Sequence, residues 1–136
     1  MENVVHRYAG KVAFGETDAS GWMHFPNVFK YVEAAEHECL HTRGVLIYDR
    51  NCGGWPRVQV SCEYKRPFLS GDSFEVLLKI SNIGVSSITW DFQVLNAARE
   101  VAAHGSMTNV RVDHRGKPTL ITTDERQKLG YERRHS

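Results

Sequence analysis

The alternation of apolar and polar residues in the second half of the chain restricts the fold more than any other feature. It is most regular in ITWDFQV, at 88–94. The segments expected to form strands are 8–14, 58–64, 74–80, 88–94 and 101–112. Successive side chains of a strand point to opposite faces, so one apolar face per strand predicts an antiparallel sheet that is covered on one side. Short connections at 82–85 and 95–100 are typical of hairpins.

Only one segment is long and apolar enough to cover that face, and it precedes four of the five expected strands. It is NVFKYVEAAEHECLHTRG, at 27–44, which is rich in good helix formers. Pro26 suits a first helical turn because its missing N–H would have no intrahelical partner there, and Gly44 is a typical stop. The residues expected to face the sheet are Val28, Tyr31, Val32, Ala35 and Cys39.

The order of one strand, one long helix and four antiparallel strands predicts an α+β fold. Its sheet has about five strands and wraps around a single long central helix. The chain has 136 residues, which is the length of one domain, so we expect a single domain at 1–136. The polar tail at 122–136 is expected to form a short terminal helix.

Charge and composition exclude several classes of protein. The formal net charge is +1 with mixed signs throughout, so nucleic acid is not expected as the main partner. No apolar run reaches membrane-spanning length, and the first ten residues lack the apolar core of a signal peptide. The three cysteines, Cys39, Cys52 and Cys62, form no CxxC pair. They predict reduced thiols in a cytoplasmic protein rather than a disulfide framework.

The segment HECLH, at 37–41, matches the zinc-peptidase pattern H-E-x-x-H. On the expected helix, His37 and His41 lie on a largely charged stripe with Lys30 and Glu33, beside the apolar face. A catalytic zinc needs a third protein ligand and an enclosing cleft. Glu63 is the nearest candidate, but it lies on the polar face of a strand. We therefore interpret HECLH as an exposed helix edge and expect no metal site.

The segment immediately before the helix, ETDASGWMHFPN at 16–27, is more informative. It places the acid Asp18 in a glycine-containing loop that leads into a helix N-terminus. The free N–H groups and the partial positive charge of such an end can hold a developing oxyanion. An acid beside them could act as a nucleophile or as a base for water. From the residues alone, Asp18 could equally cap a turn or the helix.

A wider pattern strengthens the catalytic interpretation. The chain fits D-x-x-G-x-x-H-x-x-N-x-x-x-Y-x-x-x-A through Asp18, Gly21, His24, Asn27, Tyr31 and Ala35. With this pattern the chain resembles the hotdog-fold acyl-CoA thioesterases, in the 4-hydroxybenzoyl-CoA thioesterase-like branch. YKRPFLSGD at 64–72 and IGVSSITWDFQV at 83–94 are similar to further segments of that branch, in the same order.

The resemblance implies a role for each matching residue. Asp18 aligns with the carboxylate that attacks the thioester carbonyl or activates water against it. Phe25 aligns with the residue whose main-chain N–H polarises that carbonyl, and Gly21 lets the loop turn close to the acyl group. His24 and Asn27 flank the site and are expected to orient the substrate.

Trp22 leaves the identity of the acyl group open. Trp22-Met23 stands where bacterial lipid-active members often have His-Val. The indole could narrow the acyl pocket, stack on an aromatic acyl group or pack at a subunit interface. The resemblance therefore implies a small or medium acyl-CoA, either aliphatic or aromatic.

The resemblance also implies an assembly and a set of partners. Members join two sheets edge to edge, so a homodimer or homotetramer with active sites between subunits is expected, with acyl-CoA as substrate and no cofactor. Three alternatives are an acyl carrier protein thioesterase, a hydratase of the same fold and a non-catalytic acyl-CoA binding module. Release of free thiol distinguishes the hydrolases from the other two.

Overall fold

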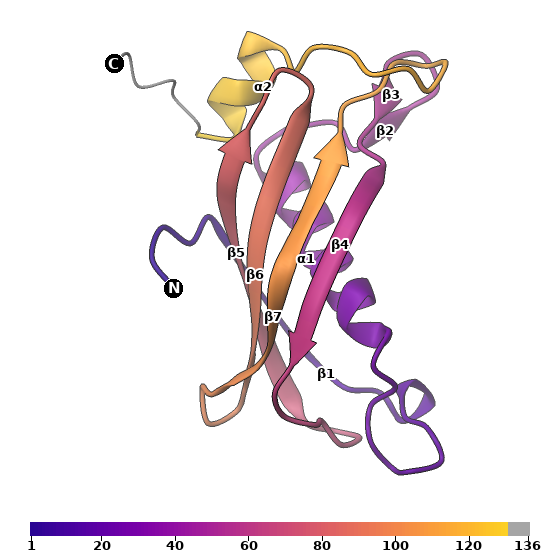
Figure 1. Cartoon of the computed structure of the whole chain (residues 1–136), viewed down its shortest axis with the longest axis vertical. Coiled ribbons are helices and arrows are strands. Elements are labelled where there is room, and N and C mark those ends of the chain that lie inside the picture. Colours follow the sequence, from indigo (N-terminus) through magenta and orange to yellow (C-terminus); the bar gives the residue numbers. More distant parts are fainter. Residues whose placement is uncertain (131–136) are drawn as a thin grey trace.

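The computed structural model describes residues 1–130, and its main body is one antiparallel sheet packed on one long helix (Figure 1). The sheet has five strands in the order β1-β5-β6-β7-β4. Their bounds are β1 His6–Lys11, β4 Arg57–Tyr64, β5 Ser73–Ile83, β6 Ser87–Asn96 and β7 Val101–Val110. All neighbours pair antiparallel, so the predicted α+β architecture is confirmed, and each of the five predicted strands has a counterpart. The first strand lies at His6–Lys11 rather than at 8–14, because Phe14 begins a short 3-10 helix.

The smaller elements lie at the two ends of this body. A short 3-10 helix, η1 (Phe14–Glu16), lies in the connection between β1 and the long helix α1 (Asn27–Thr42). At the other end lie a two-stranded hairpin, β2 (Tyr48–Asp49) with β3 (Gly53–Gly54), and the terminal helix α2 (Thr123–Lys128) (Figure 1). The helix expected in the tail is thus present, although 131–136 lie outside the described residues. The prediction of a single domain over 1–136 remains a prediction.

Helix α1 begins and ends as its sequence predicts. Pro26 immediately precedes it, and Gly44 adopts a φ of +73°, a left-handed conformation that glycine tolerates and that ends helices. The buried side chains of α1 are Val28, Tyr31, Val32, Ala35, Glu36, Cys39 and Leu40. All five predicted core residues are therefore buried, and Glu36 and Leu40 join them. His41 is exposed, as expected for its stripe.

The core lies between α1 and the inner face of the sheet. Alternate residues of β5 and β6, such as Val76, Trp90 and Phe92, are fully buried against it. Tyr31 of α1 stacks on Phe74 of β5, with ring centroids 4.1 Å apart. The helix packs most closely on β1 and β5, and it reaches β4, at the opposite edge of the sheet, through Arg57.

The exposure of the apolar side chains of β4 corrects one expectation. The apolar side chains of β4 were expected to be covered, but Val58 is 60%, Val60 38% and Tyr64 42% exposed. The alternation was interpreted correctly as a strand, yet β4 is the edge strand farthest from β1. Arg57, at the start of β4, pairs with α1, but these three side chains stay open to solvent and form an apolar strip at this edge.

Glu36 anchors a buried polar group between α1 and the strands near that edge. The Glu36 carboxylate, 1% exposed, accepts a hydrogen bond from Nδ2 of the buried Asn109 at 2.9 Å and pairs with the guanidinium of Arg57. Arg57 also reaches Glu33, at 2.9 Å. Burial raises the pKa of Glu36, against the opposing effect of Arg57. The group ties the helix to both β4 and β7.

The sequence predicts no membrane-spanning segment, and the two α-helices can be compared with that prediction. Within residues 1–130, neither α-helix combines the length and the apolar composition needed to cross a bilayer.

Candidate active site

The loop before α1 closes on itself as a small hairpin. Thr17 and Met23 form an antiparallel bridge, and the Asp18 N–H donates to the carbonyl of Trp22 at 2.9 Å. The Gly21 N–H returns to the Asp18 carbonyl at 3.0 Å, and Gly21 has a φ of +85°. A side chain there would strain the backbone, which explains why a glycine occupies this turn. Asp18 and Trp22 therefore lie directly opposite each other.

The carboxylate of Asp18 is held within its own turn. One oxygen, Oδ1, accepts the Ser20 N–H at 2.8 Å and the Ser20 hydroxyl. The other, Oδ2, lies 3.8 Å from Nδ1 of His24. The Ser20 hydroxyl and N–H, together with the nearby His24, lower the pKa of Asp18 below its usual value. The side chain is open to solvent and is therefore an accessible, ionised carboxylate at neutral pH.

One main-chain N–H at the mouth of α1 has no acceptor. The His24 N–H donates to the Glu16 carbonyl at 2.7 Å, and the Asn27 N–H to the His24 carbonyl at 3.0 Å. Pro26 has no N–H to offer. Among residues 1–130, no atom accepts a hydrogen bond from the Phe25 N–H. A free donor thus stands at the partly positive end of the helix, seven residues after Asp18.

The end of β4 and the segment that follows it contact the loop and hold it in place. The Met23 N–H donates to the Phe68 carbonyl at 2.7 Å, and Trp22 bridges to Leu69. The Tyr64 hydroxyl donates to the Phe25 carbonyl at 2.9 Å, and the two rings meet edge to face with centroids 5.7 Å apart. Burial raises the pKa of Tyr64 to about 12, so the phenol remains a donor at physiological pH.

An open cleft of about 270 Å³, the Trp22 cleft, lies where these segments meet. It is lined by Trp22, Met23, Phe25, Tyr64, Lys65, Arg66, Pro67 and Phe68. Its walls are largely aromatic, and its two cations each pair with a carboxylate: Lys65 with Glu63 at 3.6 Å and Arg66 with Glu100 at 3.0 Å. The cleft could take a flat apolar group next to the Asp18 loop.

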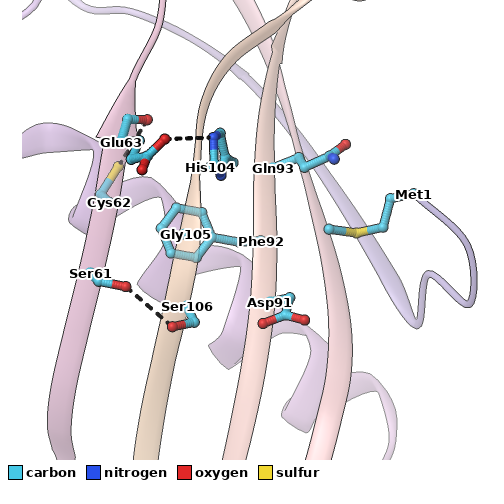
Figure 2. A pocket seen from close by; sticks show the side chains of 10 residues that line it. All are labelled: Met1, Ser61, Cys62, Glu63, Asp91, Phe92, Gln93, His104, Gly105 and Ser106. Carbon is cyan, nitrogen blue, oxygen red and sulfur yellow. Dashed lines mark hydrogen bonds and ion pairs between the residues drawn. The ribbon is translucent and has the colours of Figure 1, made fainter.

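A separate hollow lies on the outer face of the sheet (Figure 2). It is polar, and its side chains pair across strands: His104 with Glu63 at 3.2 Å, and Ser61 with Ser106 at 3.2 Å. No residue of the Asp18 loop lines it. Pairs of this kind are usual on the solvent face of an antiparallel sheet, so this hollow carries no argument for catalysis.

The six predicted site residues all lie within segment 18–27, which in the structure forms the hairpin loop and the first residue of α1. The side-chain amide of Asn27 donates to two main-chain carbonyls, that of Glu16 at 3.0 Å and that of His24 at 3.1 Å. It therefore shapes the loop, and a direct substrate contact by Asn27 remains a prediction. Sequence reasoning assigned no role to Glu16 and Tyr64, whose contacts with this loop are described above. The matched YKRP segment is the one signal that pointed towards Tyr64.

HECLH lies on α1, away from this loop. Its second histidine, His41, is exposed and His37 is half-buried. Among residues 1–130, no three His, Cys, Asp or Glu side chains come together as a set of metal ligands. The interpretation of the motif as an edge of the helix fits this placement.

A five-stranded antiparallel sheet around one helix, with an acidic loop at the helix mouth, is the hotdog arrangement of thioester hydrolases. Comparison with known proteins agrees, because the chain belongs to the thioesterase-like superfamily, whose family model matches residues 12–129. The predicted hotdog fold and the predicted class of enzyme, a thioester hydrolase, are thereby confirmed.

Individual relatives show how the similarity is distributed. A 1,4-dihydroxy-2-naphthoyl-CoA hydrolase of Nostoc punctiforme is 29% identical over 141 residues, covering 95% of each chain. A protein of Aquifex aeolicus, provisionally named an esterase, is 34% identical over 97 residues, or 70% of this chain and 76% of its own. A solved gentisyl-coenzyme A thioesterase superposes with a TM-score of 0.82 at 27% identity, covering 90% of this chain and 98% of its own.

Proposed function

We propose that this chain hydrolyses an acyl-CoA thioester to the free acid and CoA, with Asp18 as the reacting carboxylate and the Phe25 N–H as the oxyanion donor. The observation that carries the proposal is the unused Phe25 N–H at the mouth of α1, on the same short loop as an ionised, accessible Asp18. A thioester whose carbonyl oxygen accepts a hydrogen bond from that N–H would present its carbonyl carbon to the Asp18 loop.

Two routes are compatible with this geometry. In one, an Asp18 oxygen attacks the carbonyl carbon, the C–S bond breaks with release of the CoA thiolate, and water then cleaves the resulting anhydride. In the other, Asp18 takes a proton from a water molecule that attacks the same carbon, and the departing thiolate is protonated. Both place negative charge on the carbonyl oxygen, where one preorganised donor lowers the barrier by about 3 kcal/mol.

The aromatic lining of the Trp22 cleft supports a small or medium acyl group that is aromatic rather than aliphatic. Trp22, Phe25 and Tyr64 offer rings against which a planar acyl group can stack, and ring–ring contacts add to the apolar burial that an aliphatic chain would also gain. Several relatives are named for aromatic acyl groups, as the dihydroxynaphthoyl-CoA hydrolase and the gentisyl-coenzyme A thioesterase are.

A second copy of the chain is the proposed partner. The apolar strip on β4 lies at an open sheet edge, and such edges need cover. Pairing of β4 with β4 of a second copy would cover the strip and join two sheets. The Asp18 loop contacts Tyr64 at one end of β4, through Phe25, so each active site would lie at this joint. A homodimer is therefore the unit proposed to act, and the cytoplasm remains its predicted location.

The test is thiol release from a panel of aromatic and aliphatic acyl-CoAs, followed with a disulfide reagent. Asp18→Asn should lower turnover by on the order of 10² to 10⁴-fold, the usual value of a positioned acid or base, while folding is unchanged. Asp113→Asn is the matched control, because Asp113 also accepts main-chain N–H groups in an exposed turn, from Arg115 and Lys117. It should leave turnover unchanged.

Other outcomes identify the alternatives. Equal turnover for Asp18→Asn and the parent would remove Asp18 from the mechanism. Binding of acyl-CoA with no thiol release would indicate a binding module or a hydratase. Release only from thioesters on acyl carrier protein would change the substrate class.

A further inference from the structure

Glu16 is a charged side chain that is almost fully enclosed beside the Asp18 loop. It ends η1, and its side chain is only 12% exposed. Its Oε1 accepts the Tyr31 hydroxyl at 2.7 Å and the Ala13 N–H at 2.8 Å, and its Oε2 pairs with Lys30 at 2.9 Å. These donors come from the connection that enters the loop and from the first turns of α1.

The main chain of the same residue binds the other end of the loop. The Glu16 carbonyl accepts the His24 N–H at 2.7 Å and Nδ2 of Asn27 at 3.0 Å. Glu16 thus joins the residues before the loop, the residues after it and the helix.

Two catalytic atoms depend on this junction. Asp18 follows Glu16 by two residues, and the Phe25 N–H belongs to the peptide that joins Phe25 to His24. The contact from His24 to the Glu16 carbonyl therefore sets how far the carboxylate of Asp18 stands from the oxyanion donor. It also removes the His24 N–H as a rival donor, so that of these two neighbouring groups the Phe25 N–H is the free one.

We propose that Glu16 is a positioning residue that fixes the Asp18 carboxylate relative to the Phe25 N–H. The inference rests on the proposed function, since it assigns those two groups to the reaction. Misplacement of a reacting group by about 1 Å costs on the order of 100-fold in rate, so the junction controls turnover without touching substrate.

The charge of Glu16 is part of this role. Burial raises the pKa of Glu16, but the Ala13 N–H and the contacts with Lys30 and Tyr31 outweigh that effect and lower the pKa below its usual value. The carboxylate therefore stays ionised and accepts from all three donors together. Tyr31 is held in turn by its stacking on Phe74, which makes the attachment point rigid.

The experiment compares Glu16→Gln with the parent in the thiol-release assay, with the best substrate of the panel. An amide of the same size loses the pairing with Lys30 and turns an N–H₂ group towards a donor. We expect kcat to fall about 10- to 100-fold while KM stays within about twofold, because only the reacting geometry changes. Lys30→Met, which changes an exposed side chain, should lower kcat several-fold in the same way.

Glu38→Gln is the matched control. Glu38 lies on α1, the helix that the Glu16 side chain contacts, and it also pairs with a basic side chain, His6 at 2.9 Å, but far from the loop. This variant should keep the kcat of the parent. A purely structural role for Glu16 would lower the melting temperature and leave kcat unchanged at a temperature where the variants are folded, which would overturn the proposal.

A double variant separates this proposal from the proposed function. If Glu16 acts through Asp18, adding Glu16→Gln to Asp18→Asn should change the residual rate by less than about twofold, because the effects of residues that act as one unit are not additive. A further drop as large as that of the single variant contradicts positioning. Full turnover in Asp18→Asn would instead refute the proposed function itself.

Discussion

Ser20 lowers the pKa of the proposed catalytic acid. Its hydroxyl and N–H both donate to Oδ1 of Asp18, while the side chain of Asp18 remains open to solvent. Hydrogen bonds to the charged form favour it, so the lowered pKa of Asp18 needs no buried cation. An acid used as a nucleophile or base must be deprotonated, and this turn extends its ionised range to lower pH.

A pH profile tests that relation. The rate carried by Asp18 is present above its pKa and lost below it, so kcat/KM should stay level down to pH values below the ordinary aspartate range. In Ser20→Ala the hydroxyl donor is gone and the pKa of Asp18 returns towards its usual value. The acid limb of kcat/KM, which reports the free enzyme, should therefore move to higher pH. An unmoved limb would assign that limb to another group.

The residues of the site differ in how far the sequence could predict them. Asp18, Gly21 and Phe25 lie within one short motif, so their pattern was visible. Glu16 and Tyr64 act through contacts 15 and 39 residues away, with Tyr31 and Phe25. No local spacing encodes such contacts, because they depend on how the strand and the helix meet.

Helices and strands were predictable where a local sequence pattern determines them. The strands follow from alternation and α1 from its start and stop residues, and the structure confirms these elements, with the first strand at His6–Lys11 instead of the predicted 8–14. The exposure of β4 did not follow, since it depends on strand order, which places β4 farthest from the side where α1 packs. Glu36 also departed from the expected pattern, because its burial requires Asn109 and Arg57, contributed by strands β7 and β4.

The contribution of the contact between α1 and β4 to stability can be measured by substituting Glu36 and Glu33, the two partners of Arg57. Glu36→Ala leaves Arg57 and Asn109 without their buried partner, and loss of one side of a buried pair costs about 3 to 5 kcal/mol of unfolding free energy. Glu33→Ala removes a half-exposed partner of the same Arg57 and should cost about 1 kcal/mol or less. Urea unfolding at fixed protein concentration measures both. Similar losses in the two variants would show that the buried group adds little.

At the scale of the whole molecule, an apolar strip lies beside the candidate active site. Val60 lies near the middle of β4, and Tyr64, which holds the Phe25 carbonyl, ends it. A two-fold pairing of β4 strands runs them antiparallel, which brings the Tyr64 end of one protomer to the Arg57 end of its partner. The proposed active site would then border the second copy, and assembly and turnover should be lost together.

Val60→Lys tests this coupling. A lysine on the strip places a charge where the partner strand would pack, so the protein should sediment as a monomer and lose at least about tenfold in turnover, as edge lysines oppose strand pairing. Leu120→Lys is the control, because Leu120 is also an exposed apolar residue, 65% accessible, but lies outside the sheet. It should change neither property. A monomeric Val60→Lys with full turnover would show that one protomer is sufficient, and a dimeric one would place the interface on another surface.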